Sequence, residues 1–528
     1  MKTFAAIDIG SFESAMKIFE FSAKTGMKEI DCIKHSLDLG SDTYAKGKIS
    51  RDKMDDLCHT LKEFADIMKA YKVEDYQAYG TSAIREMENS TIVLDQIEQR
   101  TGIKLSVLSN SEQRFLDYKS IASKGDAFQK IIEEKTAVLD IGGGSIQVSL
   151  FDNDTLVSTQ NLRLGVLRIQ EYLNYVHPRN SQYEALVEEI AMAQLATYKK
   201  IYLKDKEIKN VIVMDDYLAP WVVKASRMKG SGVIAGIASD GSVTPAGLEK
   251  LLNYLKTHSA SQLADKMDIA EEKVILVYIS AVLTQRIAGM MGAERIRFPG
   301  VTLCDGIAYE FAEKHKLLKN VHDFEQDIIA CAININKRYM GSRKRSENID
   351  HIATTIFDSM KKLHGLGKRE RLFLRIAAIL QDCGRFISLT NIGENSYNII
   401  MATEMIGLSH AERETVASVV RFNHGNFDYR GQMGSENKTV NRSSAELDKG
   451  SYLTVAKLTA ILRLANSLDR SHKQKLEGLK SVLKENTLVL TTDTMEDVTL
   501  ERRYFESGTD FFREVFGVQP VLKQKKNF

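Results

Sequence analysis

The chain has 528 residues and a net charge of +2 at neutral pH, with 43% hydrophobic and 27% charged residues. This length suits three or four globular domains, and the balanced charge excludes a polyelectrolyte, so any anion site has to be local. We expect neither nucleic acid nor a membrane as a partner, since no run is judged to reach membrane-span length. The five cysteines show no CxxC pair and no secretory leader is expected, which favours a reduced, cytoplasmic protein.

The first predicted element is a β-hairpin with an acid and a glycine at its turn. Residues 3–7 form an apolar strand that leads into Asp8, Gly10 and Ser11. Residues 15–21 then alternate apolar with other side chains, which is the pattern of a second strand.

The rest of the first segment is predicted to alternate strands with helices. We expect strands at 30–39, 76–79 and 104–108, helices at 50–72, 90–99 and from residue 112, and a loop at 44–48. The run GTSAIRE follows the strand at 76–79 and contains Arg85. This arginine is predicted to lie at the edge of a cleft, with a structural salt bridge as the alternative.

A second hairpin with the same features occupies residues 136–151. Its first strand ends at Asp140, and its turn consists of Gly142, Gly143, Gly144 and Ser145. Glycines let backbone N–H groups approach an anion such as phosphate, and a carboxylate beside them can hold a metal-bound water. The motif is not a GxGxxG that opens a helix, so it does not predict a dinucleotide fold. Taken alone, it could also be a glycine turn without a ligand.

The two acid–glycine–serine hairpins together are typical of a duplicated actin-like, ribonuclease-H-like fold. In that fold the hairpins face each other across a cleft and hold a polyphosphate from both sides. We therefore predict an α/β protein with two such lobes, at 1–125 and 126–308.

The pattern changes in the second half of the chain. Apolar residues recur only at helical spacing from residue 310 onward, which predicts an all-α domain at 309–475. The tail predicts a small α+β cap at 476–528. Its expected elements are strands at 481–484, 487–491, 499–504 and 518–522, and a helix at 510–515.

Taken together, these motifs resemble the exopolyphosphatase/guanosine pentaphosphate phosphohydrolase family. They follow the family's order over most of the chain: DIGS at Asp8, GTSAIRE at Gly80, SNSEQ at Ser109, DIGGGS at Asp140, LGVLR at Leu164 and MGAERI at Met291. The resemblance implies two actin-like lobes followed by helical and accessory domains. It also implies hydrolysis, with Mg²⁺, of the terminal phosphoanhydride of inorganic polyphosphate or of pppGpp.

The resemblance gives each candidate residue an expected role. Backbone N–H groups around Gly10 and Ser11 and in the turn of the second hairpin would hold the terminal phosphates. Asp8 and Asp140 would bind Mg²⁺, and Arg85 would present a planar guanidinium to a phosphate. The family's general base is a glutamate at the start of a helix, within an S-G-x-E-E-A pattern.

The chain departs from the family at the residues that activate water. An ungapped alignment puts Gln113 at the position of the general base, and a neutral amide cannot take a proton from water. Glu112 is one residue away, so a one-residue change of register would bring a carboxylate into the catalytic position. Gln147 likewise stands where the family has a second glutamate. These changes predict slow hydrolysis, or binding of the anionic chain without turnover.

Two other motifs of the second lobe are altered. Residues 214–217, Met-Asp-Asp-Tyr, replace a glycine-rich turn that is expected to contact the base or the chain end of the substrate. Residues 303–306, Leu-Cys-Asp-Gly, replace Leu-Arg-Glu-Gly, so a phosphate-facing arginine of the family is missing.

The helical half resembles the HD phosphohydrolase fold, in which two histidines and two aspartates bind a divalent metal. His351 matches the first ligand and Asp382 the acid of the His-Asp pair, but Gln381 and Asn466 replace the other two. A working metal site is therefore not expected. The basic run 337–345 predicts either a polyphosphate channel or a solvated helix end. Helical halves of this kind often pair, so we expect a homodimer.

The expected function is thus an exopolyphosphatase-type phosphohydrolase. The alternative is a catalytically weakened regulatory protein that binds polyphosphate or an alarmone. A sugar or acetate kinase of the actin-like superfamily is a third candidate, which the GTSAIRE run and the helical half disfavour.

Overall fold

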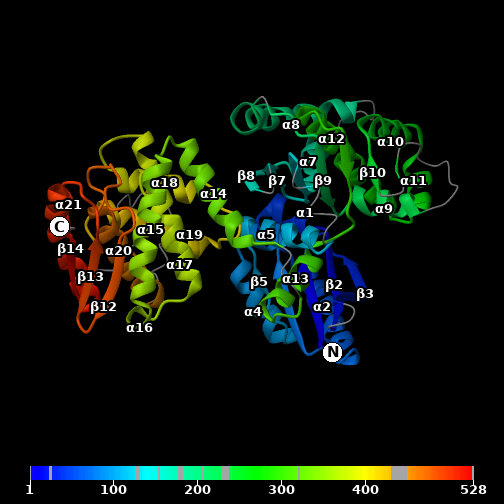
Figure 1. Ribbon diagram of the computed structural model, residues 1–528. Helices are drawn as coiled ribbons and strands as arrows, with labels where there is room; N and C mark the ends of the chain where they lie inside the picture. Colours follow the sequence, from blue (N-terminus) through cyan, green and yellow to red (C-terminus); the bar gives the residue numbers. More distant parts are fainter. Residues whose placement is uncertain are drawn as a thin grey trace. The chain divides into compact units, whose positions relative to one another are not determined.

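The structure is a computed structural model. It describes residues 2–22, 26–124, 131, 134–152, 155–176, 182–204, 206–227, 237–238, 241–318, 322–429 and 449–525. The chain divides into two compact units, Met1–Asp323 and Phe324–Phe528 (Figure 1). The domain boundary predicted between 125 and 126 lies outside the described residues.

The N-terminal unit contains two lobes. Lobe I is built on a five-stranded sheet in the order β3-β2-β1-β4-β5. Its strands are β1 (Lys2–Ile9), β2 (Glu13–Ser22), β3 (Gly26–Ser36), β4 (Asp75–Gly80) and β5 (Ser106–Val107). The first three strands are antiparallel neighbours, whereas β4 runs parallel to β1 and β5 runs parallel to β4. Its helices are α1 (Leu39–Lys46), α2 (Arg51–Ala70), α3 (Ser82–Glu86), α4 (Ser90–Thr101) and α5 (Asn110–Ala122).

Lobe II repeats this topology around a six-stranded sheet in the order β10-β11-β9-β6-β7-β8. Its strands are β6 (Thr136–Ile141), β7 (Ile146–Asp152), β8 (Thr155–Leu162), β9 (Asn210–Asp215), β10 (Ser242–Val243) and β11 (Arg295–Arg297). Again three strands in chain order are antiparallel, and β9 and β11 extend the sheet in parallel from β6. The repeat of order and direction confirms the predicted α/β, actin-like fold for this part of the chain.

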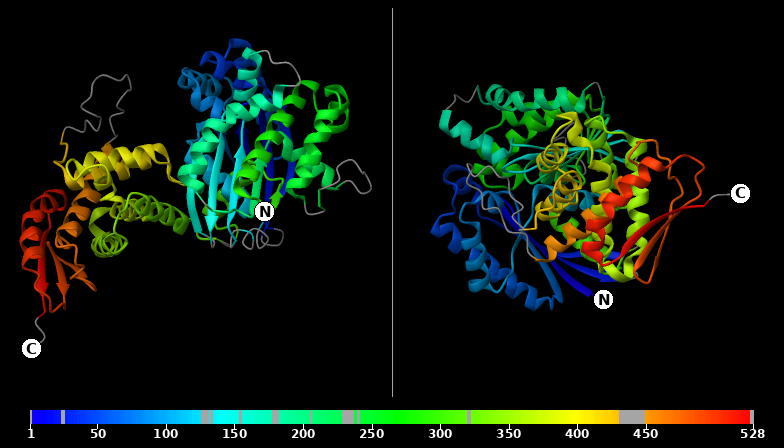
Figure 2. Two further views of the ribbon diagram at one scale, coloured as in Figure 1. Left: turned by 90° about the horizontal axis from the view of Figure 1, so that it is seen from above. Right: turned by 90° about the vertical axis from the view of Figure 1, so that its left-hand side faces the viewer.

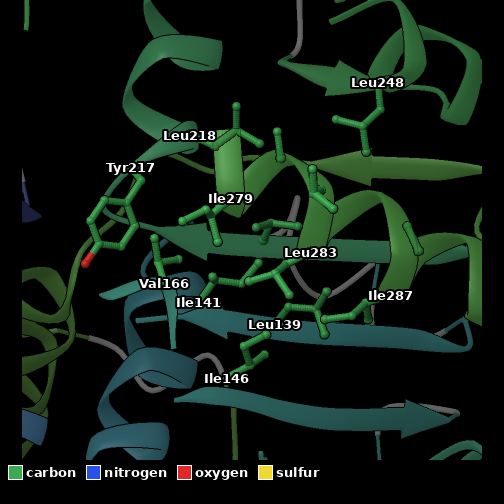
Figure 3. Close-up of a cluster of buried hydrophobic side chains, with 14 of the residues drawn as sticks. Leu139, Ile141, Ile146, Val166, Tyr217, Leu218, Leu248, Ile279, Leu283 and Ile287 are labelled. Atoms are coloured by element: carbon green, nitrogen blue, oxygen red, sulfur yellow. The ribbon is translucent and has the colours of Figure 1, made fainter. Parts of the chain in front are cut away.

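Helices pack on the lobe II sheet through a large apolar core. The helical elements are α7 (Val166–Val176), α8 (Tyr183–Tyr198), a π-helical turn (Lys199–Leu203), α9 (Leu218–Arg227), α10 (Pro245–Thr257), α11 (Ala260–Met267), a 3-10 turn (Glu271–Lys273) and α12 (Val274–Met291). Ile279, Leu283 and Ile287 recur every four residues on α12, so they share one face. That face meets Leu139 and Ile141 of β6 (Figure 3).

The helix α12 corrects one expectation. Together with the preceding turn, the segment Glu271–Met291 is long and apolar enough to cross a membrane by length and composition. No run of this length was expected from the sequence. However, 67% of the most apolar window of this segment is buried inside the protein, and a core helix of a soluble protein passes the same test.

The chain returns to lobe I after lobe II. Helix α13 (Leu303–Lys314) covers a face of the lobe I sheet, where the rings of Phe4 and Phe311 stack with centroids 4.0 Å apart. A Cβ at Gly306 would overlap the backbone of Leu116 on α5, so glycine is needed for this close approach. The predicted boundary at 308/309 thus falls inside a helix of the N-terminal unit, which extends to Asp323.

One local prediction in lobe I is wrong. The loop expected at 44–48 is mostly helix, because α1 runs from Leu39 to Lys46 and ends at Gly47, whose φ is 72°. Four of its eight residues are buried although apolar side chains are few, so tertiary packing rather than periodicity stabilises this helix. As a result, Tyr44 lies on a helix beside the first hairpin.

The C-terminal unit is helical over most of its length. Its helical elements are α14 (Phe324–Arg338), α15 (Arg343–Ser359), α16 (Lys361–His364), α17 (Lys368–Leu380), a 3-10 turn (Cys383–Phe386), α18 (Ile392–Ala402), α19 (His410–His424) and α20 (Lys449–Ser467). Helix α17 contacts α14, α15, α19 and α20, and its residues Leu374, Ile376 and Ala377 are fully buried. These contacts make α17 the central helix of the unit.

The chain ends in a three-stranded sheet with one helix (Figure 2). The elements are β12 (Lys480–Lys484), β13 (Thr487–Thr492), α21 (Thr499–Phe516) and β14 (Gln519–Gln524). The strand predicted at 499–504 is wrong, because these residues open α21. Phe505, Thr509 and Phe512 are buried at helical spacing, whereas Leu500 and Tyr504 are exposed.

Candidate active site

A small, partly open cavity of about 50 Å³ lies between the two hairpin turns of the N-terminal unit. The β1–β2 turn contributes Asp8, Gly10 and Ser11 to its walls, and the β6–β7 turn contributes Asp140 and residues 142–145. The cavity is several times larger than the ~10–15 Å³ that one water needs. Its walls are mainly polar. The size and lining suit a phosphate group.

The two turns have the same backbone hydrogen bond. The Gly10 N–H donates to the Glu13 carbonyl at 3.0 Å, and the Gly142 N–H donates to the Ser145 carbonyl at 3.0 Å. The turns are therefore equivalent parts of the two lobes, which agrees with the repeated sheet topology.

Glycine is required where the second turn meets lobe I. A Cβ on Gly143 would lie 3.0 Å from the Cβ of Ser11, and one on Gly144 would overlap the Ser82 hydroxyl and the Tyr44 hydroxyl. The N–H groups of Ser11, Gly143 and Gly144 donate to no acceptor in the described part of the chain. Unpaired N–H groups around a polar cavity are suited to an anion.

Tyr44 and Arg168 connect the two lobes beside the cavity. The Tyr44 hydroxyl lies 2.7 Å from Ser11 Oγ, and the Arg168 guanidinium lies over the Tyr44 ring at 4.8 Å from its centroid. Arg168 Nε donates to the Gly144 carbonyl at 3.1 Å, and its Nη2 pairs with Glu86 at 2.8 Å. A turn of one lobe is thus fixed to a helix of the other.

Carboxylates gather at one end of the cavity. Asp8, Asp117, Asp140 and Asp216 all line it. Burial, followed by the charges of Asp216 and Asp140, raises the pKa of Asp8 well above its usual value. Burial and the neighbouring Asp140 raise the pKa of Asp117 strongly, and burial raises the pKa of Asp140 to about 7. Acids that repel one another in this way favour binding of a cation.

The adjacent Asp215 has a structural role. Its Oδ1 accepts from the Tyr217 N–H at 2.6 Å and its Oδ2 from the Leu218 N–H at 2.9 Å, at the start of α9. Ser280 of α12 also donates to this carboxylate. The Met-Asp-Asp-Tyr segment therefore caps a helix with its first aspartate and presents the second, Asp216, to the cavity.

The start of α5 shows which of two neighbouring residues faces the cavity. Ser109 caps the helix, and the Glu112 carboxylate accepts the Ser109 N–H at 2.9 Å in a capping box. Gln113 points the other way, and its Nε2 donates to Asp140 Oδ2 at 3.3 Å. Glu112 is not among the residues that line the cavity, whereas Gln113 is.

Arg85 lies behind Gln113 and not in the cavity wall. Its Nη1 donates to the Leu108 carbonyl at 2.7 Å and to Gln113 Oε1 at 3.4 Å. Burial lowers the pKa of the Arg85 guanidinium. In this structure the arginine positions Gln113 instead of forming part of the cavity lining.

The second replaced acid, Gln147, is held by a buried arginine. Arg114 Nε donates to Gln147 Oε1 at 2.7 Å, and Arg114 also donates to the Thr159 hydroxyl. Gln147 is 2% exposed and lines the cavity. The amide is thus fixed in one orientation, with its oxygen toward Arg114.

The N-terminus of α13 completes the cavity wall through Thr302 and Leu303. Asp305 accepts the Thr302 N–H at 2.7 Å and pairs with the buried ammonium group of Lys17 at 2.9 Å. The residues that replace the family's Leu-Arg-Glu-Gly segment therefore stabilise the start of the helix. The cation in this region comes from β2.

Among the described residues, no group of three His, Cys, Asp or Glu side chains is placed as a complete metal site. Asp8 Oδ1 is nevertheless a buried oxygen without a hydrogen-bond partner there. Mg²⁺ prefers oxygen ligands and is usually held by one or two carboxylates with waters and substrate phosphates. Asp8 and Asp140 fit that pattern.

The predicted HD-type ligands of the C-terminal unit do not meet. His351 is exposed, whereas Asp382 Oδ2 accepts a hydrogen bond from Arg345 Nε at 2.7 Å. Arg345 also bonds Asp469 at 3.0 Å and the side chain of Asn466. A guanidinium thus occupies the centre of the acidic cluster. Arg345 is only 5% exposed, so this member of the basic run at 337–345 is not part of a basic surface.

The structure brings together most of the predicted site residues, namely Asp8, Gly10, Ser11, Gln113, Asp140, Gly142, Gly143, Gly144 and Ser145. It leaves Arg85 and Glu112 outside the lining. Tyr44 and Asp117 were not predicted from the sequence, whereas Asp216 belongs to the segment 214–217 that was expected near the substrate. Only Asp117 had a local signal, because it follows Gln113 by four residues on a predicted helix and therefore shares its face.

Two family models match the chain. The model of the Ppx/GppA phosphatase family matches residues 18–315, and the model of Ppx/GppA phosphatase domain III matches residues 329–506. The first match alone covers more than half of the chain and spans lobe II and lobe I from within β2 onward.

Individual proteins agree with these models. The chain is 22% identical over 303 residues to exopolyphosphatase 1 of Mycobacterium tuberculosis, covering 57% of this chain and 86% of that protein. It is 22% identical over 511 residues to the guanosine-5'-triphosphate,3'-diphosphate pyrophosphatase of Vibrio atlanticus, covering 92% and 91%. The crystal structure of an exopolyphosphatase from Cytophaga hutchinsonii shares its fold, with a TM-score of 0.51 and 18% identity over 61% of this chain and 100% of that one. The chain belongs to the Ppx/GppA phosphatase family.

Proposed function

We propose that the protein removes the terminal phosphate from a linear phosphate chain, either inorganic polyphosphate or pppGpp. The observation that carries this proposal is the cavity between two equivalent acid–glycine hairpins, with unpaired N–H groups on Ser11, Gly143 and Gly144. Relatives named as an exopolyphosphatase and as a guanosine-5'-triphosphate,3'-diphosphate pyrophosphatase support the choice of substrates.

The size of the cavity favours the end of a chain over its middle. A cavity of about 50 Å³ has room for a few waters, which is comparable with a phosphate group. Most of the substrate would therefore remain outside, with only its terminal phosphate between Ser11 and Gly143. Backbone N–H groups and the Ser11 and Ser145 hydroxyls would hold that phosphate without any change in protonation.

We propose Mg²⁺ as the cofactor, held by Asp8 and Asp140. When bound there, the ion would neutralise charge on the terminal phosphates, which is the main requirement of phosphoryl transfer. The chain's own contribution is to fix the phosphate between the two turns and to exclude bulk water from it.

A catalytically weakened binding protein is the second candidate. It is favoured by one observation, namely that an amide, Gln113, faces Asp140 while Glu112 is engaged in the helix cap. Such a protein would bind the phosphate chain with the same turns and signal through a change in the relative position of the lobes.

Release of orthophosphate from polyphosphate and from pppGpp, each with Mg²⁺, separates the two candidates. The proposal predicts steady release that is lost in Asp140→Ala. Asp66→Ala on the exposed face of α2 is the matched control and should keep the wild-type rate. Tight binding of either substrate without release would support the binding protein instead.

A further inference from the structure

One buried carboxylate in the cavity, Asp117, has no role in the function proposed above. Asp117 lies on α5 one helical turn after Gln113, so the two side chains share a face of the helix. Both line the cavity. Asp117 is 4% exposed, and its Oδ2 has no hydrogen-bond partner among the described residues.

The surroundings of Asp117 do not explain it as a structural residue. Its carboxyl lies within hydrogen-bonding reach of Asp140, and the nearest charges that act on it include Asp140, Asp8 and Asp216, all acids. A buried carboxylate among other carboxylates destabilises the fold unless a ligand or a reaction uses it. The same cavity is lined by Gln113 and Gln147, the two amides at positions where the family pattern has glutamates.

We propose that Asp117 is a catalytic residue that accepts the proton of the attacking water, a role that Gln113 cannot fill. The inference rests on the phosphohydrolase function proposed above. The inference is based on geometry. Asp117 and Gln113 are one helical turn apart, both line the cavity, and both lie close to Asp140.

The step balances without any further reactant. The water oxygen forms a bond to the terminal phosphorus, and the bond between that phosphorus and the bridging oxygen breaks. The proton of the water passes to Asp117 Oδ2, and the shortened chain leaves with the bridging oxygen. Asp117 then returns its proton to solvent as orthophosphate departs.

Three variants test the inference. Asp117→Asn has the same shape and removes the acid. Glu112→Gln makes the same acid-to-amide change on the same helix, but outside the cavity, and glutamine retains the capping box. The double variant Gln113→Glu/Asp117→Asn places the carboxylate one helical turn earlier on α5, at position 113.

We expect Asp117→Asn to lower kcat by about 100-fold or more, since general-base catalysis contributes on that order. Its dissociation constant for polyphosphate and the Mg²⁺-dependent rise in its Tm should stay close to the wild-type values. Glu112→Gln should keep the wild-type kcat. The double variant should regain about tenfold of the lost rate, because Glu at position 113 can accept the proton in place of Asp117.

The inference is overturned if Asp117→Asn keeps most of the wild-type kcat, or if the double variant regains nothing. It is also overturned if Asp117→Asn loses the Mg²⁺-dependent rise in Tm and its rate recovers at high Mg²⁺, because Asp117 would then be a metal ligand. A wild-type protein that binds both substrates but hydrolyses neither would overturn the proposed function together with this inference. A hydrolytic wild type with an unaffected Asp117→Asn would overturn the inference alone.

Discussion

Gln113 Nε2 donates a hydrogen bond to Asp140 Oδ2 across 3.3 Å, so an amide faces the acid of the second hairpin. The same amide accepts from Arg85 at 3.4 Å through its oxygen. Gln113 therefore links a cation of lobe I to a carboxylate of lobe II. The side chain at position 113 therefore affects how a water in the cavity can lose its proton.

Gln113→Glu should raise kcat by about tenfold, because it adds a carboxylate that can accept a proton within the cavity. Arg85 lies close enough to stabilise the new charge. The measurement is the initial rate of orthophosphate release at saturating substrate. Gln99→Glu on the exposed surface of α4 is the control and should leave the rate unchanged. A lower kcat in Gln113→Glu would indicate that the hydrogen bond to Asp140 matters more than an additional proton acceptor.

Ser109→Ala should destabilise the N-terminal unit by about 1 kcal/mol through loss of the helix cap, with little change in kcat. Glu112→Ala should cost less stability, since it removes one half of the capping box. Urea denaturation and steady-state rates measure the two effects separately. Complete loss of activity in Glu112→Ala, with stability retained, would show that Glu112 and not Gln113 faces the substrate.

Gly144→Ala should weaken substrate binding by at least about tenfold, because its Cβ would overlap the Ser82 and Tyr44 hydroxyls. The turn would have to move away from lobe I, which would displace the N–H groups around the phosphate. Gly289→Ala is the matched control in lobe II, since a Cβ there meets nothing within 4 Å. The dissociation constant for polyphosphate is the readout, and equal affinities of the two variants would contradict this role of the turn.

The stability of the metal-free protein should fall as the pH rises from about 4 to about 7. Burial raises the pKa of Asp140 and of Asp215 to about 7, so each binds a proton in the folded state that the unfolded state has already released. The stabilising contribution of a raised pKa is fully present below the unfolded value of 3.8 and is lost as the pH approaches the folded value.

Thermal unfolding between pH 5 and pH 8 measures this dependence. Asp140→Asn should flatten the profile, whereas Asp66→Asn on exposed α2 should not. Mg²⁺ should raise the Tm at pH 8 and have little effect at pH 5, because protons compete for the same oxygens. A Tm that rises steadily with pH and does not change when Mg²⁺ is added would contradict the assignment of a cation site at Asp8 and Asp140.

Arg345→Met should destabilise the C-terminal unit by about 3–5 kcal/mol, because it leaves the buried carboxylates of Asp382 and Asp469 without their shared cation. His351→Ala removes an exposed side chain and should change stability by less than about 0.5 kcal/mol. Chemical denaturation of the full chain compares the two. Bound divalent metal that is lost in His351→Ala would contradict the account of this cluster.

The two hairpins could be predicted from the sequence because each is local. An acid, glycines and a serine at a strand end need no information from elsewhere in the chain. The repeated sheet topology then followed from finding the motif twice. By contrast, Tyr44 reaches Ser11 only through the arrangement of separate elements, so no sequence pattern pointed to it.

The register at Glu112 and Gln113 could have been settled from the sequence. Ser109 and Glu112 form an S-x-x-E capping box, which commits the glutamate to the helix start and turns the next residue to another face. The surroundings of the HD-type residues could not be predicted, for the opposite reason. Similarity of residue type pointed to His351, but the helix α15 buries Arg345 and exposes the histidine. The motif did not show that Arg345 would be buried and His351 exposed, and this difference determines which residues form the cluster.

The central claim is that water attacks the terminal phosphorus of a chain held between the two turns. Hydrolysis of polyphosphate or pppGpp in ¹⁸O-labelled water, followed by mass spectrometry of both products, tests it most directly. The account predicts one ¹⁸O atom in each orthophosphate released and none in the shortened chain, with release abolished by Asp140→Ala. Label in the shortened chain, or tight binding of both substrates without any labelled orthophosphate, would contradict it.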